Sequence, residues 1–96
     1  MKYSFVEIVD SVLKSKIPFE IKHSSFPSAL FEVLKSNETK VVLVDCDSGR
    51  EWTAKQLFDA IITLSVRFLE YEISKGDVVA CFCTNSDYHL IAMLSL

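Results

Sequence analysis

A chain of 96 residues can form at most one small domain. Half of its residues are apolar and the mean hydropathy is +0.29, which is high for a free-standing domain whose surface must be mostly polar. The composition therefore suits a piece of a larger protein, in which further chain covers the faces left open here. The net charge of −3, with ten dispersed Lys and Arg residues, argues against nucleic-acid binding.

The sequence gives no sign of a membrane anchor or a secretory signal. Its apolar runs, such as Leu90–Leu94, are far shorter than the roughly 20 residues that span a bilayer. Glu7 and Asp10 interrupt the region where the apolar core of a signal peptide would lie. Three cysteines without framework spacing indicate reduced thiols, so we expect an intracellular protein.

An amphipathic helix is predicted over residues 4–14. Apolar residues recur there at helical spacing: Phe5, Ile8, Val9, Val12 and Leu13. Ser4 and Glu7 have the spacing of a capping box, which supports a helix start at this point.

An extended segment is predicted next, over residues 15–25, because Pro18 disfavours helix at the residue before it. Residues 28–36 are expected to form a second helix, with Pro27 at a position that the first helical turn tolerates. The extended segment and the first helix together make an N-terminal arm, residues 1–27. Residues 28–96 are then expected to form a truncated α/β subdomain.

A β-hairpin is predicted after the second helix. The stretch "KVVLVDC", residues 40–46, is β-branched and apolar on both faces, as expected of a buried strand. Residues 45–49 have turn composition, and residues 50–53 would return as a short second strand.

The joint after this hairpin carries two helix-start signals. Thr53 and Gln56 form a T-x-x-Q capping box, and Trp52 and Leu57 have the spacing of a hydrophobic staple. A helix is predicted over residues 54–71. Its expected buried positions are Leu57, Ile61, Leu64 and Phe68, and its solvated face consists of Lys55, Asp59, Thr63 and Arg67.

A second buried strand is predicted over "VVACFC", residues 78–83, after a glycine turn at residues 74–77. A helix between two apolar strands indicates a right-handed βαβ crossover with parallel strands. Asn85 or Ser86 is expected to cap a last helix, with Asp87 in its first turn. That helix continues through "MLSL" with no C-terminal stop signal, so we expect the fold to be incomplete.

The cysteines and histidines are the first candidates for chemistry. Cys81 and Cys83 form a C-x-C within the predicted strand, but Cys46, His23 and His89 supply no recognisable second half of a zinc site. We therefore expect Cys81 and Cys83 to be small core residues. Neither histidine lies in a nucleophile pattern, so packing or surface roles are predicted for both.

Carboxylates and glycines offer little more. Asp45 and Asp47 flank the hairpin turn, where such side chains bond their own backbone, so turn formation is favoured over a metal or an acid–base role. Lys75, beside Gly76, could contact phosphate, but a solvated turn is the default. With only two glycines, the chain contains neither a Walker-type nor a dinucleotide-binding phosphate loop.

The order of these elements resembles the N-terminal end of the adenylate-forming enzymes, in particular acyl-CoA synthetases of the 4-coumarate–CoA ligase and luciferase-like branch. The similar stretches are "LKSKIPFEI", "SSFPSALFEVL", "VVLVDCDSGREWTAKQL" and "ISKGDVVACFCTNSDYHLIAML", so the resemblance covers about residues 11–96. Two departures are Ala54, where the family usually has an aromatic residue, and Gln56, where it has Glu. The glutamine still serves the capping box.

The resemblance implies the N-terminal part of the adenylate-forming large domain: an α/β fold with a β-hairpin and a βαβ unit between flanking helices, incomplete here. Such enzymes use ATP and Mg²⁺ to activate a carboxylic acid and then transfer it to coenzyme A. Their catalytic and nucleotide-binding groups lie further along, so no catalytic, cofactor-binding or metal residue is expected in this chain, which would be inactive alone. The matched positions Thr53, Gly76, Asp77 and Asn85 are expected to be structural.

The implied partner is the missing C-terminal remainder of the parent enzyme, and the implied location is cytoplasmic or peroxisomal. Two alternatives remain open. The first is a stand-alone interaction module that binds a partner through an exposed apolar helix. The second is a thiol-based metal or redox module.

Overall fold

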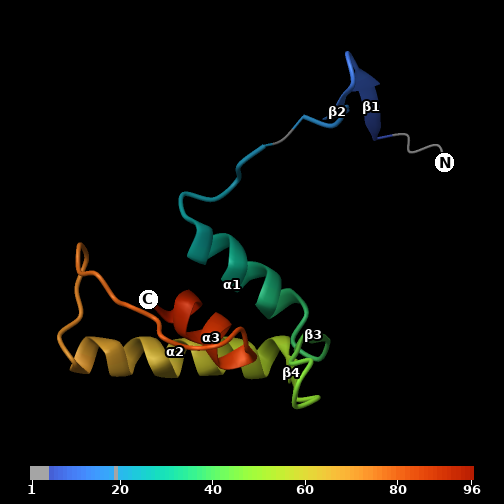
Figure 1. The fold of residues 1–96 in the computed structure, drawn as a ribbon. Coiled ribbons are helices and arrows are strands. Elements are labelled where there is room, and N and C mark those ends of the chain that lie inside the picture. The colour runs from blue at the N-terminus through green and yellow to red at the C-terminus, as the bar shows by residue number, and fades with distance from the viewer. Residues whose placement is uncertain (1–4, 19) are drawn as a thin grey trace.

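The computed structural model describes residues 5–18 and 20–96. Their elements, in chain order, are β1 (Val6–Val9), β2 (Val12–Ser15), α1 (Phe26–Ser36), β3 (Val41–Val44), β4 (Glu51–Thr53), α2 (Ala54–Glu70) and α3 (Asp87–Ser95). β1 pairs with β2 and β3 with β4, as two separate antiparallel sheets. Figure 1 shows α1 and α3 beside α2, and the β1–β2 hairpin apart from them at the end of an extended linker. The protein is therefore a small mixed α/β structure.

The N-terminal segment is a hairpin, so the predicted helix over residues 4–14 is wrong; Ser4 lies outside the described residues. The strands pair from Val6 with Ser15 to Val9 with Val12. Asp10 and Ser11 form the two-residue loop with φ of +51° and +65°. Positive φ at both positions is the geometry of a type I′ turn, whose twist matches that of the flanking strands.

The linker and α1 agree with the sequence prediction. Residues 16–18 and 20–25 form neither helix nor strand, and α1 then begins with Pro27 in its first turn. The side chain of Ser25 caps this helix by accepting a hydrogen bond from the Ser28 backbone N–H at 3.3 Å. His23 Nε2 lies 2.9 Å from Glu32 Oε2, and this contact holds the end of the linker against α1.

The β3–β4 hairpin confirms the predicted strand, turn and return strand, but β3 is not buried on both faces. Val41, Val42 and Val44 are each about half exposed, and Leu43 alone of the strand packs against the core. A strand is buried on both faces only where other elements cover both. Here β3 contacts β4 and α2, and these contacts leave the three valines about half exposed.

Helix α2 begins as predicted, with a complete capping box. The Gln56 backbone N–H donates to Thr53 Oγ1 at 3.2 Å, and the Thr53 backbone N–H donates to Gln56 Oε1 at 2.9 Å. Leu57 and Ile61 are buried, while Leu64 and Phe68 are partly buried. The predicted polar line is exposed along its whole length: Lys55, Asp59, Thr63 and Arg67.

Replacing the capping residue should weaken this joint. We expect Thr53→Ala to lower the free energy of unfolding by about 1 kcal/mol, because the N–H of Gln56 loses its acceptor. Thr63→Ala is the matched control, since Thr63 is exposed in the middle of the same helix. Its effect should stay within about 0.5 kcal/mol of zero. Urea unfolding followed by circular dichroism measures both, and equal losses would contradict a specific capping role.

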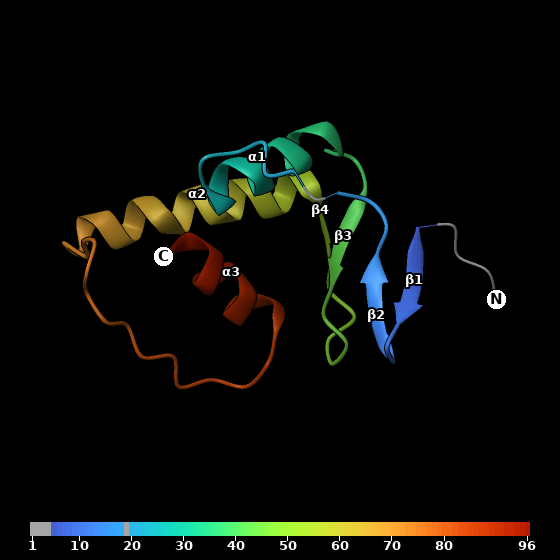
Figure 2. The same ribbon diagram turned by 90° about the horizontal axis from the view of Figure 1, so that it is seen from above.

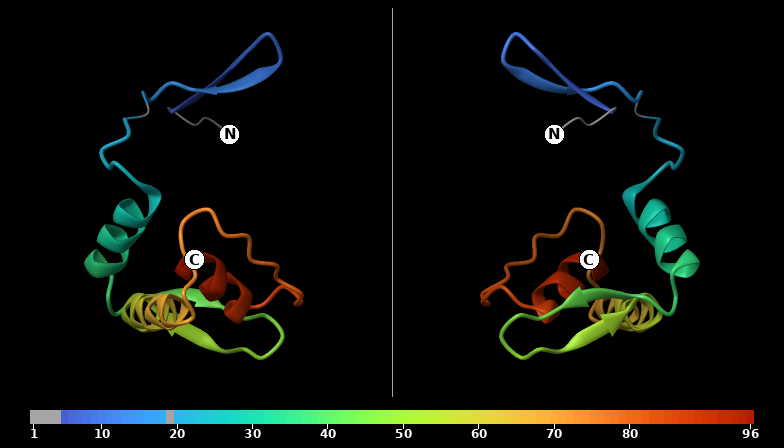
Figure 3. Two further views of the ribbon diagram at one scale, coloured as in Figure 1. Left: turned by 90° about the vertical axis from the view of Figure 1, so that its left-hand side faces the viewer. Right: turned by 90° about the vertical axis from the view of Figure 1, so that its right-hand side faces the viewer.

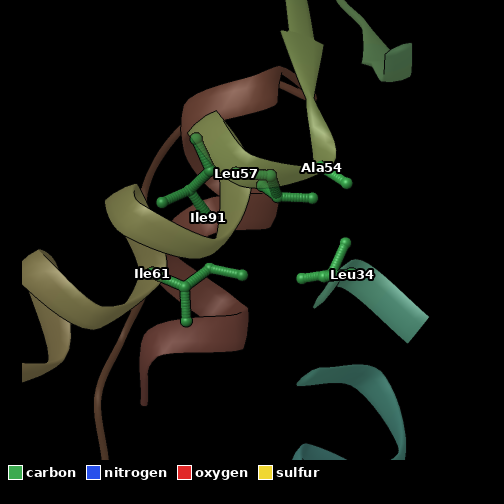
Figure 4. Packing of buried hydrophobic residues seen from close by; sticks show 5 residues of the cluster. All are labelled: Leu34, Ala54, Leu57, Ile61 and Ile91. Carbon is green, nitrogen blue, oxygen red and sulfur yellow. The ribbon is translucent and has the colours of Figure 1, made fainter. Parts of the chain in front are cut away.

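The core is small and lies on α2, which contacts both other helices (Figure 4). It joins Leu34 from α1, Ile91 from α3, and Ala54, Leu57 and Ile61 from α2. Ile61 is fully buried. Phe31 and Phe58 add an edge-to-face ring contact between α1 and α2, with their centroids 5.2 Å apart. Because α2 contacts both partners, it organises the packing of the other two helices.

The segment after α2 departs from the prediction. Residues 74–77 form the expected turn, in which the Asp77 N–H donates to the Ser74 carbonyl at 3.1 Å and Gly76 has φ of +99°. Residues 78–83, however, form no strand, so the predicted parallel βαβ unit is wrong. A parallel strand would need to bond along β3, and no described backbone hydrogen bond joins the two segments. Figure 2 shows the segment looping away from α2.

The molecule is extended for its length. Its Cα radius of gyration is 17.5 Å, whereas a compact domain of 100 residues has about 13 Å. Its accessible surface is 8134 Å², whereas a compact monomer of this mass exposes about 5,600 Å². The excess, on the order of 2,500 Å² by the same relation, is surface that a compact fold would bury.

Candidate functional site

The cysteines are not core residues, which corrects the prediction for Cys81 and Cys83. Both are exposed, as is Cys46, because the segment that carries the first two is a surface loop rather than a strand. Among the described residues, no three or more His, Cys, Asp or Glu side chains gather closely enough to hold a metal ion.

The two histidines lie on different parts of the molecule. His23 is at the end of the linker beside Glu32, and His89 is partly exposed in the first turn of α3. Lys75 lies in the glycine turn, at the edge of an open groove of about 600 Å³ between the end of α2 and the end of α3. The lining also includes Asp77, which accepts a hydrogen bond from the Ser74 backbone N–H at 2.8 Å and whose negative charge would oppose a bound phosphate.

The hairpin turn uses Asp45 in the way its sequence predicts. Asp45 Oδ2 accepts hydrogen bonds from the Ser48 backbone N–H at 2.9 Å and from Ser48 Oγ at 2.6 Å. These two bonds lower the pKa of Asp45 from its ordinary value. Asp47 is exposed in the same turn. Turn formation, rather than an acid–base pair, is thus the role that the contacts give to Asp45.

A buried carboxylate, Asp87, lies where α3 meets the β3–β4 hairpin. Ser86 caps α3 by accepting from the His89 N–H at 3.3 Å, and this start points the next side chain toward β4. Arg50 donates to both Asp87 oxygens, from Nε at 2.7 Å and from Nη2 at 3.0 Å. Trp52 Nε1 donates to Asp87 Oδ2 at 2.8 Å. The Arg50 guanidinium and the Trp52 indole therefore bind the same carboxylate, that of Asp87, from two neighbouring positions at β4.

Two further contacts complete this group. The Asp87 backbone N–H donates to Asp45 Oδ1 at 3.3 Å, so the turn of the hairpin also reaches α3. The Arg50 guanidinium lies over the Tyr88 ring, 4.3 Å from its centroid, in a cation–π contact. We call Asp45, Arg50, Trp52, Asp87 and Tyr88 the Asp87 cluster.

The electrostatics of the Asp87 cluster are those of a locked ion pair. Hydrogen bonds from Arg50 and then Trp52 hold the pKa of Asp87 well below its ordinary value, although burial opposes this shift. The same pairing raises the pKa of Arg50 above its usual range. A carboxylate with both oxygens occupied and so low a pKa is a poor general base at neutral pH. The cluster is therefore suited to fixing α3 on the hairpin rather than to catalysis.

Sequence reasoning placed Asp87 only in the first turn of α3 and missed the cluster. Its main contacts join residues 35 and 37 positions apart, and no local pattern reports such a pairing. The positions matched by the resemblance have the expected caps and turns: Thr53 caps α2, and Gly76 and Asp77 form the turn. Asn85 precedes the residue that caps α3, which is Ser86.

Two groups of exposed apolar side chains stand out among the described residues. The first, which we call the open apolar surface, comprises Val41, Val42 and Val44 on β3 together with Val78 and Phe82 on the separate loop after α2; Val78 and Phe82 are almost completely exposed. The second, the α1–α3 groove, has a volume of about 320 Å³. It is lined by Phe26, Pro27, Leu30, Phe31, Leu90, Met93, Leu94 and Leu96. Charged side chains are absent from the lining of this groove.

Comparison with known proteins adds no assignment: no family model, no curated protein and no solved structure matches the chain. In the described part of the chain, none of the helices has the length and apolar character needed to cross a membrane.

Proposed function

We propose that this chain is the N-terminal structural part of an ATP-dependent acyl-CoA ligase-type enzyme and is inactive without the remainder of that enzyme. The sequence pattern of residues 11–96 supports the family. The large exposed surface is the observation that supports a further part of the protein packing on these residues. The parent enzyme would convert a carboxylic acid, ATP and CoA to acyl-CoA, AMP and pyrophosphate.

The size and character of the exposed surface are those of an interface. An excess on the order of 2,500 Å² is within the range buried by obligate protein interfaces. Val42, Val78 and Phe82 lie in it, and exposed apolar side chains of this kind mark surfaces that associate. A strand with one uncovered apolar face, such as β3, is stabilised when another layer packs on it.

The residues present in this chain indicate which part of the parent enzyme would bind its ligands. The described residues offer no gathered metal ligands, and the sequence contains no Walker-type or dinucleotide-binding loop. We therefore assign ATP, Mg²⁺ and CoA binding to the remainder of the parent enzyme. Here the role of the Asp87 cluster is to fix the hairpin on α3, so that the exposed valines of β3 keep one orientation relative to that helix.

The decisive experiment is to sequence the transcript beyond codon 96 and to assay the longest encoded protein. We expect the reading frame to continue into a Ser/Thr/Gly-rich loop that contains Lys. The protein should release AMP and pyrophosphate in the presence of a carboxylic acid and CoA. A continuing frame without such a loop, or a protein that never forms an acyl-adenylate from a panel of acids, would overturn the proposal.

A charge placed on the open apolar surface provides a structural test. Phe82→Asp should abolish soluble expression of the longer protein, because it would bury an unpaired carboxylate in the proposed interface. The same change in the 96-residue chain should leave helix content unchanged, since Phe82 is already exposed. Thr63→Asp, on the solvated face of α2, is the control and should be tolerated in both. If the longer protein with Phe82→Asp is expressed normally, the proposal that further chain covers Phe82 is wrong.

A stand-alone interaction module is the second candidate, and the exposure of α3 favours it. Met93 on α3 and Leu96 directly after it are more than half exposed, so this end of the helix could bind a partner. A stop codon after Leu96 in the transcript, together with a stable complex that Met93→Lys dissociates, would support this module over the ligase fragment.

A further inference from the structure

Helices α2 and α3 run in the same direction, and their contacts define a register between them. The Asp87 cluster joins the start of α3 to β4, directly before α2. Ile91 then lies in the core with Ile61, and Ser65 Oγ donates a hydrogen bond to the Ser95 carbonyl at 3.0 Å. Residues four apart lie on the same face of a helix. The contacts therefore advance by four residues on each helix, from Ile61 and Ile91 to Ser65 and Ser95.

Helix α2 extends beyond the end of α3. From Ser65, α2 continues to Glu70, which is about one and a half turns, whereas α3 ends at Ser95. Figure 2 shows α3 ending part way along α2. In the uncovered part of α2, Phe68 is partly buried and Leu69 is 70% exposed. The apolar surface that α3 covers on α2 therefore continues past the last turn of α3.

The open groove of about 600 Å³ lies beside this uncovered part of α2, and we call it the α2–α3 groove. Its apolar lining comes from three segments: Phe68 and Leu69 of α2, Ile73 and Val79 of the loop after α2, and Leu96 after α3. The turn at residues 74–77 adds polar groups to the lining. Figure 3, in which α2 is seen nearly end-on, shows this loop on the side of α2 where α3 lies. The groove is therefore a direct continuation of the interface between the two helices.

A further turn of α3 would match this groove. The last four carbonyls of a helix have no partner within it, and residues added in helical geometry donate their N–H groups to them. The third and fourth positions after Ser95 would then face Phe68 and Leu69, which are the third and fourth positions after Ser65. Apolar side chains at those two positions would remove apolar area of both helices from water.

We propose that the α2–α3 groove is the docking site for the next one to two turns of α3, whose apolar side chains would pack on Phe68, Leu69 and Ile73. That native chain supplies these turns rests on the proposed function, in which further chain follows Leu96. The preference of the groove for an apolar helix can be measured without that chain.

Designed C-terminal extensions test the docking. Seven strongly helix-forming residues are added after Leu96, with leucines at the third, fourth and seventh positions after Ser95. The control extension has the same composition, but its leucines lie on the opposite face of the helix. We expect the first extension to slow hydrogen exchange of the amides of residues 66–70 at least about tenfold. The control extension should leave these rates unchanged.

A substitution in the groove makes the test specific. Leu69→Glu should leave the helix content of the 96-residue chain unchanged, because Leu69 is 70% exposed there. In the extended chain it should remove the added protection, since the docked leucines would cover an unpaired carboxylate. Val66→Glu is the matched control: Val66 is 50% exposed on the same helix but does not line the groove. The protection should therefore persist in that variant.

Four results would overturn this site. Protection by neither extension would mean that the groove does not bind an apolar helix, and equal protection by both would mean that the leucines do not enter it. Protection that survives Leu69→Glu would place the extension elsewhere. Protection that increases with protein concentration would assign the groove to a helix of a second copy. None of these measurements depends on ligase activity, so a failure of this site is distinguished from a failure of the proposed function.

Discussion

Ile61→Ala should be the most damaging single substitution in the core, lowering the free energy of unfolding by about 2–5 kcal/mol. Ile61 is 0% exposed and lies on α2 in a core that joins all three helices. Truncation removes apolar contacts and leaves a cavity that the few surrounding core residues cannot fill. Urea unfolding, followed by the fluorescence of the single tryptophan, Trp52, measures the loss.

The adjacent residue provides the control. Ile62 is on the same helix but 39% exposed, so Ile62→Ala should cost less than about 1 kcal/mol, partly offset by the helix propensity of alanine. Losses of similar size for the two variants would mean that α2 does not organise the core as described. An Ile61→Ala variant with nearly the same free energy of unfolding as the original chain would also contradict a core organised by α2.

Local signals in the sequence predicted the local structure well. Thr53 and Gln56 need only three residues of separation to form a capping box, and both of its hydrogen bonds are present. Pro27, near the start of α1, and the turn at residues 45–49 depend on equally short contacts. When the contacts that stabilise a cap or a turn join residues only a few positions apart, the sequence of that segment is enough to predict the structure.

The N-terminal prediction failed because its apolar pattern fits two periods. Ile8, Val9 and Val12 have helical spacing, yet β-branched residues at these positions also suit paired strands. The deciding feature is the loop of Asp10 and Ser11, where both residues adopt positive φ. Asp-Ser is a weaker signal for such a turn than Asn-Gly, so the local pattern alone favours a helix.

The apolar stretch at residues 78–83 failed for a non-local reason. Its composition is that of a buried strand, and it led us to place Cys81 and Cys83 in the core. Burial depends on partners elsewhere in the chain, and within the described residues no strand pairs with this segment. An apolar stretch left exposed is what we expect if its neighbours belong to the remainder proposed above.

The other substitution with a large expected effect is Asp87→Asn, which should be the most destabilising change of a polar residue. The asparagine would offer one acceptor and two donors where Arg50 and Trp52 both require acceptors, and one donor would face the guanidinium. The Asp87 side chain is 0% exposed, so water cannot replace the lost bonds. Asp59→Asn, which breaks only an exposed pair with Lys55, is the control and should have little effect.

The dependence of this loss on pH identifies its cause. The pKa of Asp87 is lowered in the folded protein from an ordinary value of 3.8. The stability that this carboxylate contributes is therefore fully present at neutral pH. It begins to fall as the pH decreases through the unfolded value and is lost as the pH passes below the folded one. The urea midpoints of the original and Asp87→Asn chains should thus differ most near neutral pH and converge in strong acid. Since Asp45 also has a lowered pKa, part of the acid sensitivity should persist in the variant. A difference between the two chains that is independent of pH would mean that the shape of the aspartate side chain, rather than its charge, fixes α3 to the hairpin.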